Sequence, residues 1–81
     1  AFVNVKDKRI LLVGATGVLG RQYSTILAAE GAKLIVADRS QSDVNDLAKN
    51  LGAHSIIMDI GDEAQIIEGI KKAASFYGGF D

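Results

Sequence analysis

Short apolar runs and helical apolar stripes alternate along the chain. The first run, Arg9–Val13, is nearly unbroken and stops at Gly14, which is typical of a strand buried on both faces. After it the apolar residues follow a helical spacing, and the expected C-cap of that helix is Gly31. One stripe of the helix carries Leu19, Tyr23, Ile26 and Leu27.

The same alternation repeats twice more. A second strand is predicted over Lys33–Ala37, followed by the polar residues 38–40, and a third over Ser55–Met58. The helix between them should begin at Ser40 or Ser42 as N-cap and end at Gly52. Its inner face is expected to hold Val44, Leu47, Ala48 and Leu51.

A third helix is predicted after the third strand. Asp62 and Gln65 have the spacing of a capping box, and the pair Gly78-Gly79 would end the helix. The apolar residues along it are Ile66, Ile67, Ile70, Ala74 and Tyr77. The order βαβαβα predicts an α/β, Rossmann-type three-layer fold whose parallel sheet has the strand order 3-2-1. Residues 1–81 would then be the N-terminal dinucleotide-binding half of one domain.

Composition narrows the classes of function. The chain is 48% hydrophobic and 23% charged with a net charge of -1, which suits a soluble globular protein and gives no reason to expect nucleic acid or a membrane as partner. The absence of cysteine excludes disulfides and thiolate chemistry, and the single histidine, His54, leaves no cluster for a metal. His54 should begin a strand or lie in its loop. Without a signal-like N-terminus, a cytoplasmic location is expected.

Three glycines between the first strand and the first helix indicate phosphate binding. In Gly14–Gly20, the first glycine allows a sharp turn, Gly17 a close approach to a pyrophosphate, and Gly20 tight packing of helix on strand. The positive end of the helix dipole would face the phosphates. An ATP-binding loop is excluded because Arg21, not lysine, follows the last glycine.

Context makes this weak motif stronger. Asp38 follows the second strand, 18 residues beyond Gly20, where a carboxylate can bind the ribose hydroxyls of a dinucleotide. Its charge would repel a 2'-phosphate, so NAD is favoured over NADP. Arg39 leaves the alternative open, because its guanidinium could bind that phosphate or stack on adenine. Asp38 and Arg39 could also be a solvated loop pair.

The chain resembles the short-chain dehydrogenase/reductase family over essentially its whole length. Four segments carry the resemblance: 12–21 (LVGATGVLGR), 29–39 (AEGAKLIVADR), 58–60 (MDI) and 76–81 (FYGGFD). The resemblance implies that Gly14, Thr16, Gly17, Val18 and Leu19 surround the pyrophosphate and ribose. The Thr16 hydroxyl could instead stabilise the turn, and the Leu19 side chain could belong to the core. The resemblance also implies that Asp59 and the Ile60 N–H contact the adenine, although Asp59 could instead be a turn or capping residue.

Two departures concern the branch of the family. Val13 stands where the family usually has threonine, and the glycine spacing G-x-x-G-x-x-G is that of the extended, sugar-nucleotide-modifying branch. The ending FYGGFD argues for the standard branch, which is favoured. The family's catalytic Tyr-x-x-x-Lys pair is not expected in this chain, because Leu27 follows Tyr23 by four residues and Asp81 follows Tyr77. Both tyrosines are interpreted as packing residues.

Three functions stay open. The first is a part of an NAD-dependent dehydrogenase or reductase that acts on an alcohol/carbonyl pair, a small-molecule substrate, as a homo-oligomer. The second is an extended-branch epimerase, dehydratase or reductase, and the third a non-catalytic nucleotide-binding module. Because the first strand would lack a partner on one edge, the isolated chain is expected to self-associate or to be weakly stable.

Overall fold

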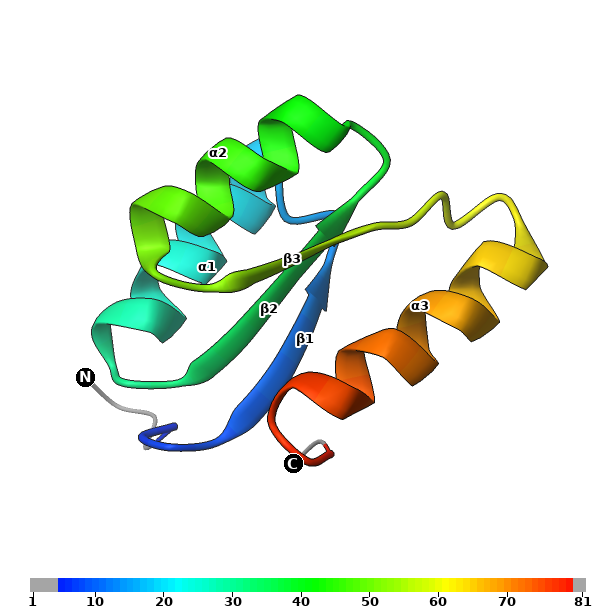
Figure 1. Cartoon of the computed structure of the whole chain (residues 1–81). Helices are drawn as coiled ribbons and strands as arrows, with labels where there is room; N and C mark the ends of the chain where they lie inside the picture. Colours follow the sequence, from blue (N-terminus) through cyan, green and yellow to red (C-terminus); the bar gives the residue numbers. More distant parts are fainter. Residues whose placement is uncertain (1–4, 80–81) are drawn as a thin grey trace.

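Strands and helices alternate along the chain in the expected α/β order (Figure 1). The computed structural model describes residues 5–79. Its elements are β1 (Arg9–Val13), α1 (Val18–Ala29), β2 (Lys33–Asp38), α2 (Gln41–Leu51), β3 (His54–Ile57) and α3 (Glu63–Phe76). The third strand begins one residue earlier than expected, at His54, and ends before Met58. The Met58 N–H still donates to the Asp38 carbonyl oxygen at 2.9 Å.

The three strands form one parallel sheet in the order β1-β2-β3, which is the predicted order. Helices α1 and α2 cover one face of this sheet and α3 covers the other (Figure 1). The central strand β2 therefore has no solvent-facing side, and its residues 34–37 are buried. Among residues 5–79, β1 pairs with β2 alone, so its other edge has no strand beside it.

Alternate residues of β2 enter two separate apolar cores, because successive side chains of a strand point to opposite faces. Leu34 and Val36 pack on the α2 side, against Val44, Leu47 and Ala48. Ile35 and Ala37 pack on the α3 side, against Ile56, Met58 and Ala73. The predicted inner face of α2 is thus confirmed, with Leu51 partly buried at its end.

The outer stripe of α1 corrects a prediction from the sequence. Leu19, Tyr23 and Ile26 are 64%, 54% and 56% exposed, so Tyr23 is not a packing residue among the described parts of the chain. Leu27 of the predicted stripe does pack against the core, together with Ala28. The small residues Gly20 and Ser24, the latter fully buried, also lie on this inner side. A Cβ on Gly20 would collide with the Gly14 carbonyl oxygen and the Ala15 backbone. Close approach of the backbones therefore decides which side of α1 faces inward.

The C-cap of α1 is Glu30 and not the predicted Gly31, which follows it with φ +87°. The caps of α2 and α3 follow the sequence, with one difference. Ser40 is the N-cap of α2, although its side chain makes no capping bond, and Gly52 is the left-handed C-cap. At the start of α3, Asp62 Oδ1 accepts from the N–H groups of Ala64 (3.0 Å) and Gln65 (3.3 Å). The expected capping box is incomplete, since the Gln65 side chain accepts from the Asp59 N–H and not from that of Asp62.

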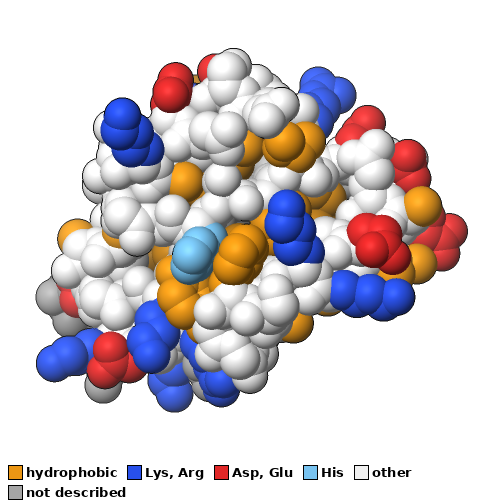
Figure 2. Space-filling model, in the orientation of Figure 1, with side chains coloured by type: hydrophobic (Ala, Val, Ile, Leu, Met, Phe, Trp, Pro, Cys, Tyr) orange, Lys and Arg blue, Asp and Glu red, His pale blue; other side chains and the backbone are white. Residues whose placement is uncertain are grey.

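The end of α3 is attached to the beginnings of the strands. The Tyr77 hydroxyl donates to the Leu34 carbonyl oxygen at 3.2 Å, and its side chain packs against the core on the α3 side, which confirms it as a packing residue. Burial raises the pKa of Tyr77. His54, at the start of β3, stacks on Phe76 with ring centroids 4.2 Å apart. Figure 2 shows the histidine among hydrophobic side chains at the surface. Gly78 and Gly79 end the helix as predicted, whereas residues 80 and 81 of the FYGGFD stretch lie outside the described part.

Candidate functional site

The turn after β1 is built by backbone hydrogen bonds around a left-handed glycine. Gly14 has φ +75°, a conformation that other residues rarely adopt. The N–H groups of Gly14 and Ala15 both donate to the Ala37 carbonyl oxygen, at 2.9 and 3.2 Å. The turn is thereby fixed to the end of β2. Arg21 holds it from the other side, because its Nε donates to the Thr16 carbonyl oxygen at 2.9 Å.

Helix α1 begins directly at this turn and has no side-chain cap. Its N-cap Gly17 supplies no side-chain acceptor, and no acidic residue lies in the first turn. The first N–H groups of a helix have no acceptor within the helix, and the helix dipole adds positive potential there. Val18 and Leu19 stand at this end with exposed side chains. The arrangement suits an anion that approaches the backbone.

Asp38, the last residue of β2, turns its carboxylate toward the glycine-rich turn. Its Oδ2 accepts from the Thr16 hydroxyl at 2.6 Å and from the Thr16 N–H at 3.0 Å. Its Oδ1 accepts from the Arg39 N–H at 2.8 Å. The Thr16 hydroxyl is the main cause of a lowered Asp38 pKa, and partial burial opposes the effect. The carboxylate is therefore ionised at neutral pH, with its geometry held by three donors.

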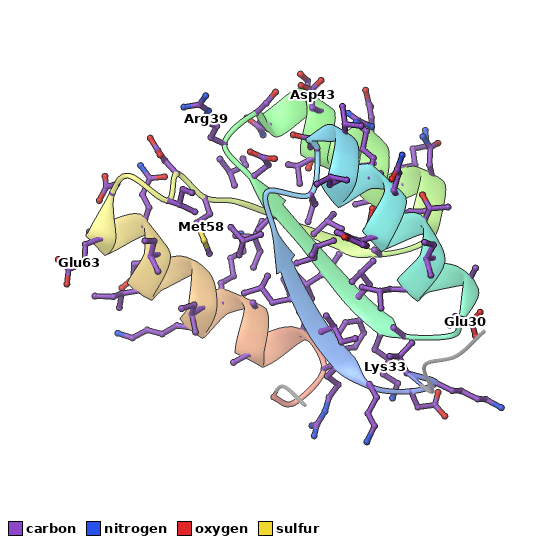
Figure 3. The ribbon with its side chains drawn as sticks, turned by 180° about the vertical axis from the view of Figure 1, so that it is seen from behind. Glu30, Lys33, Arg39, Asp43, Met58 and Glu63 are labelled. Atoms are coloured by element: carbon purple, nitrogen blue, oxygen red, sulfur yellow. The ribbon has the colours of Figure 1, made fainter. Side chains whose placement is uncertain are left out.

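The carboxyl ends of the three strands open onto a common cavity of about 310 Å³. β1 contributes Val13 and Gly14, β2 contributes Asp38 and Arg39, and the segment after β3 contributes residues 58–60. Figure 3 shows the Arg39 side chain pointing away from the body of the molecule and Met58 lying toward α3. The cavity lining therefore combines apolar residues with three charged ones, Asp38, Arg39 and Asp59.

Side-chain hydrogen bonds hold the loop between β3 and α3. Asp59 Oδ1 accepts from the Gly61 N–H at 2.9 Å, so the Asp59 side chain stabilises a turn. The Asp59 N–H donates to Gln65 Oε1 at 3.0 Å, and Gln65 Nε2 donates to Asp62 Oδ2 at 3.2 Å. Gln65 thus connects the first turn of α3 to the cavity lining. Ile60 projects from this loop with an exposed side chain.

The sequence that forms this site matches the model of a known protein family. The family model for short chain dehydrogenases matches residues 8–81. The chain belongs to the short-chain dehydrogenase family. That membership agrees with the resemblance drawn from segments 12–21, 29–39, 58–60 and 76–81.

Two similar oxidoreductases support the assignment to this family. The chain is 31% identical over 78 residues to an uncharacterised oxidoreductase of Staphylococcus aureus (strain USA300), covering 93% of this chain and 34% of the relative. It is 32% identical over 81 residues to the galactitol 2-dehydrogenase of Agrobacterium fabrum, covering 98% of this chain and 32% of that enzyme. The chain therefore spans about a third of the length of the curated relatives it matches.

A solved structure reproduces the fold of this short-chain dehydrogenase region. The crystal structure of ribose-5-phosphate isomerase from Brucella melitensis 16M matches all of the chain with a TM-score of 0.91. The sequence identity is 26%, and 32% of that longer chain is covered. The half Rossmann-type fold predicted from the sequence is thus found in a known structure.

The structure brings most of the residues singled out by sequence into one place. Gly14, Asp38, Arg39, Asp59 and Ile60 line the cavity, whereas Gly17, Val18 and Leu19, at the start of α1, do not line it. Thr16 is joined to the cavity through Asp38.

Sequence reasoning missed four residues of this candidate site. Val13 and Met58 line the cavity, and their positions at the ends of apolar runs could have indicated this. Gln65 holds the β3–α3 loop, for which the Asp62–Gln65 spacing gave a partial signal. Arg21 holds the glycine turn, and nothing in the sequence pattern indicates that contact.

No group of three or more histidine, aspartate or glutamate side chains within residues 5–79 could hold a metal ion. No helix in the same residues is long and apolar enough to span a membrane.

Proposed function

We propose that this chain is the N-terminal half of a Rossmann domain and binds the adenosine and pyrophosphate of NAD. The whole protein would be an NAD-dependent oxidoreductase that acts on an alcohol/carbonyl pair of a small molecule, as a homo-oligomer. The observation that carries the proposal is the Asp38 carboxylate, held ionised at the wall of the cavity where the three strands end. Family membership and the dehydrogenase relatives support the class of reaction.

Each part of the nucleotide has a matching group. A carboxylate at Asp38 accepts hydrogen bonds from ribose hydroxyls and repels a 2'-phosphate, which favours NAD over NADP. The N–H groups of Val18 and Leu19 suit the pyrophosphate, with Gly14, Thr16 and Gly17 around it and the adjoining ribose. Asp59 and the Ile60 N–H suit the edge of the adenine. Arg39 could cover the adenine face by stacking.

The catalytic acid or base would come from outside these 81 residues. Neither Tyr23 nor Tyr77 is followed by a lysine four residues later, and neither lines the cavity. The described residues therefore serve to bind and orient the dinucleotide. NAD, when bound, supplies the hydride acceptor.

Calorimetric titration with NAD and with NADP tests the proposal. Asp38→Asn keeps the shape of the side chain but removes the charge, and it should weaken NAD binding by about tenfold or more while narrowing the preference over NADP. Asp43→Asn is a matched control, because Asp43 is an exposed acid in the first turn of the neighbouring α2 and lies outside the cavity lining. Equal NAD affinity in Asp38→Asn and the wild type would contradict the proposal.

One observation favours a second candidate, an enzyme of the extended branch. The structure uses all three glycines of the G-x-x-G-x-x-G pattern, and the third contacts the first across the turn. Extended-branch enzymes hold NAD tightly as a sugar nucleotide is modified. Mass spectrometry of nucleotide released by denaturing the purified protein separates the two, since retained stoichiometric NAD supports the extended branch and its absence the standard branch.

A further inference from the structure

Thr16 places two donors on a single oxygen of Asp38. Its hydroxyl lies 2.6 Å and its N–H 3.0 Å from Asp38 Oδ2, across 22 positions of sequence. The Thr16 hydroxyl is thus committed to the carboxylate and is not directed at a phosphate. Both residues are partly buried, so the hydrogen bonds are partly shielded from water.

The hydrogen bonds leave one acceptor site of the carboxylate open. An ionised carboxylate offers about four lone-pair sites on its two oxygens. The two Thr16 donors take those of Oδ2, and the Arg39 N–H takes one of Oδ1. The open site is therefore on Oδ1, and the carboxylate cannot rotate without breaking the bonds from Thr16.

Thr16 is itself held on both sides. Its carbonyl oxygen accepts from Arg21 Nε at 2.9 Å, and its neighbour Ala15 donates to the Ala37 carbonyl oxygen at 3.2 Å. Its β-branched side chain has few rotamers. The contact between the glycine turn and the end of β2 is thereby fixed before any ligand binds.

We propose that Thr16 is a positioning residue for the nucleotide: it fixes the Asp38 carboxylate so that Oδ1 receives a ribose hydroxyl. The inference rests on the proposed function, because it assumes that the ribose binds at Asp38. It assigns the Thr16 side chain a role through Asp38, in place of a contact with the pyrophosphate. Groups of this kind raise affinity by holding the binding partner in the required geometry before the ligand arrives.

The pKa of Asp38 gives a second measure of what the Thr16 hydroxyl does. The charged groups near this carboxylate are Arg39 beside it, Arg21 on the glycine turn and Asp59 across the cavity. None of these is altered when only the Thr16 hydroxyl is removed. Loss of that hydroxyl should therefore raise the Asp38 pKa toward its ordinary value, since the hydrogen bond it donates favours the charged form.

The experiment compares NAD affinity in the wild-type chain and in Thr16→Val, Thr16→Ser, Asp38→Asn and the double variant Thr16→Val/Asp38→Asn. Thr16→Val keeps the side-chain shape and the backbone N–H, and should weaken NAD binding about fivefold to tenfold, as expected for a hydrogen bond to a charged group. Thr16→Ser should restore the affinity to within about twofold, because the donor returns. The carboxyl ¹³C resonance of Asp38, followed against pH, should titrate at higher pH in Thr16→Val.

The double variant separates the two roles of Thr16. If Thr16 acts through Asp38, adding Thr16→Val to Asp38→Asn produces no further loss, since the carboxylate is already gone. A further fivefold to tenfold loss in the double variant would assign Thr16 to the phosphates and overturn the inference. NAD binding unchanged in Thr16→Val would overturn it as well, with the proposed function intact. No saturable NAD binding by the wild type would overturn both.

Discussion

Replacement of Gly20 by alanine should destabilise the chain, although alanine is the better helix former. Gly20 lies in the first turn of α1, where the helix crosses the end of β1. A methyl carbon there would lie 2.8 Å from Ala15 Cα and 2.9 Å from the Ala15 carbonyl carbon, and would collide with the Gly14 carbonyl oxygen. All of these atoms belong to the backbone, so no side chain can rotate away.

The free energy lost in Gly20→Ala follows from how far α1 must move away from the turn. Moving from 2.8 Å to ordinary van der Waals contact requires α1 to shift by at least about 0.6 Å from the turn. Overpacking of this kind costs about 1–3 kcal/mol, and the immobile backbone places it at the upper end. The helix propensity of alanine offsets up to about 1 kcal/mol. A net loss of about 1–2 kcal/mol follows, a large share of the roughly 4–12 kcal/mol expected for a chain of this size.

Urea unfolding, followed by circular dichroism at low protein concentration, measures this loss. With a slope near 1 kcal/mol per molar urea, the midpoint should fall by about 1–2 M. Gly69→Ala in α3 is the matched control, because a Cβ there meets the Met58 Cε atom, the end of a flexible side chain. That variant should stay within about 0.5 kcal/mol of the wild type or exceed it. Equal midpoints for Gly20→Ala and the wild type would refute the reasoning, as would equal losses in both variants.

Four other substitutions, with Ser40→Ala as the control for Asp62→Ala, are tested by the same unfolding assay. Asp62→Ala should cost about 1 kcal/mol because it removes a side-chain N-cap, whereas Ser40→Ala should cost little because Ser40 makes no such bond. Tyr77→Phe should cost about 0.5–1.5 kcal/mol through loss of the hydrogen bond to the Leu34 carbonyl, and no change would show that water replaces it. Folding lowers the Asp38 pKa. The ionised carboxylate therefore stabilises the folded chain above its unfolded pKa, and this stabilisation is lost as pH falls through its folded pKa. Asp38→Asn should make the free energy of unfolding less dependent on pH in that acid range.

The sequence predicted the strands well because a parallel strand is buried on both faces and leaves an unbroken apolar run, as in Lys33–Asp38. For α1 the prediction was right only in part. Leu27 of the predicted stripe packs against the core, whereas Leu19, Tyr23 and Ile26 are exposed. Gly20 and Ser24 lie on the inner side instead. Hydropathy measures transfer from water, whereas the inner side of α1 is chosen by how closely two backbones can approach.

The candidate site, too, could be predicted from the sequence only in part. The position of Asp38 could be predicted because the end of a buried strand is fixed by the strand itself, and the spacing from Gly20 follows from one βα unit. The bonds from Thr16 to Asp38 and from Gln65 to Asp59 could not, because each depends on the path of a loop and on a side-chain rotamer. Loop paths are set by many weak contacts that no short motif records.

Because three strand ends meet at one cavity, a ligand bound there would stabilise the folded protein against unfolding and degradation. An occupant would touch segments near residues 13, 38 and 59, which lie far apart in the chain and come together only in the folded state. A ligand present at a hundred times its Kd adds about 2.7 kcal/mol to the free energy of unfolding. Proteases attack the unfolded chain, so the occupied protein would be degraded more slowly than the empty one. Its abundance in a cell would then follow the supply of its ligand.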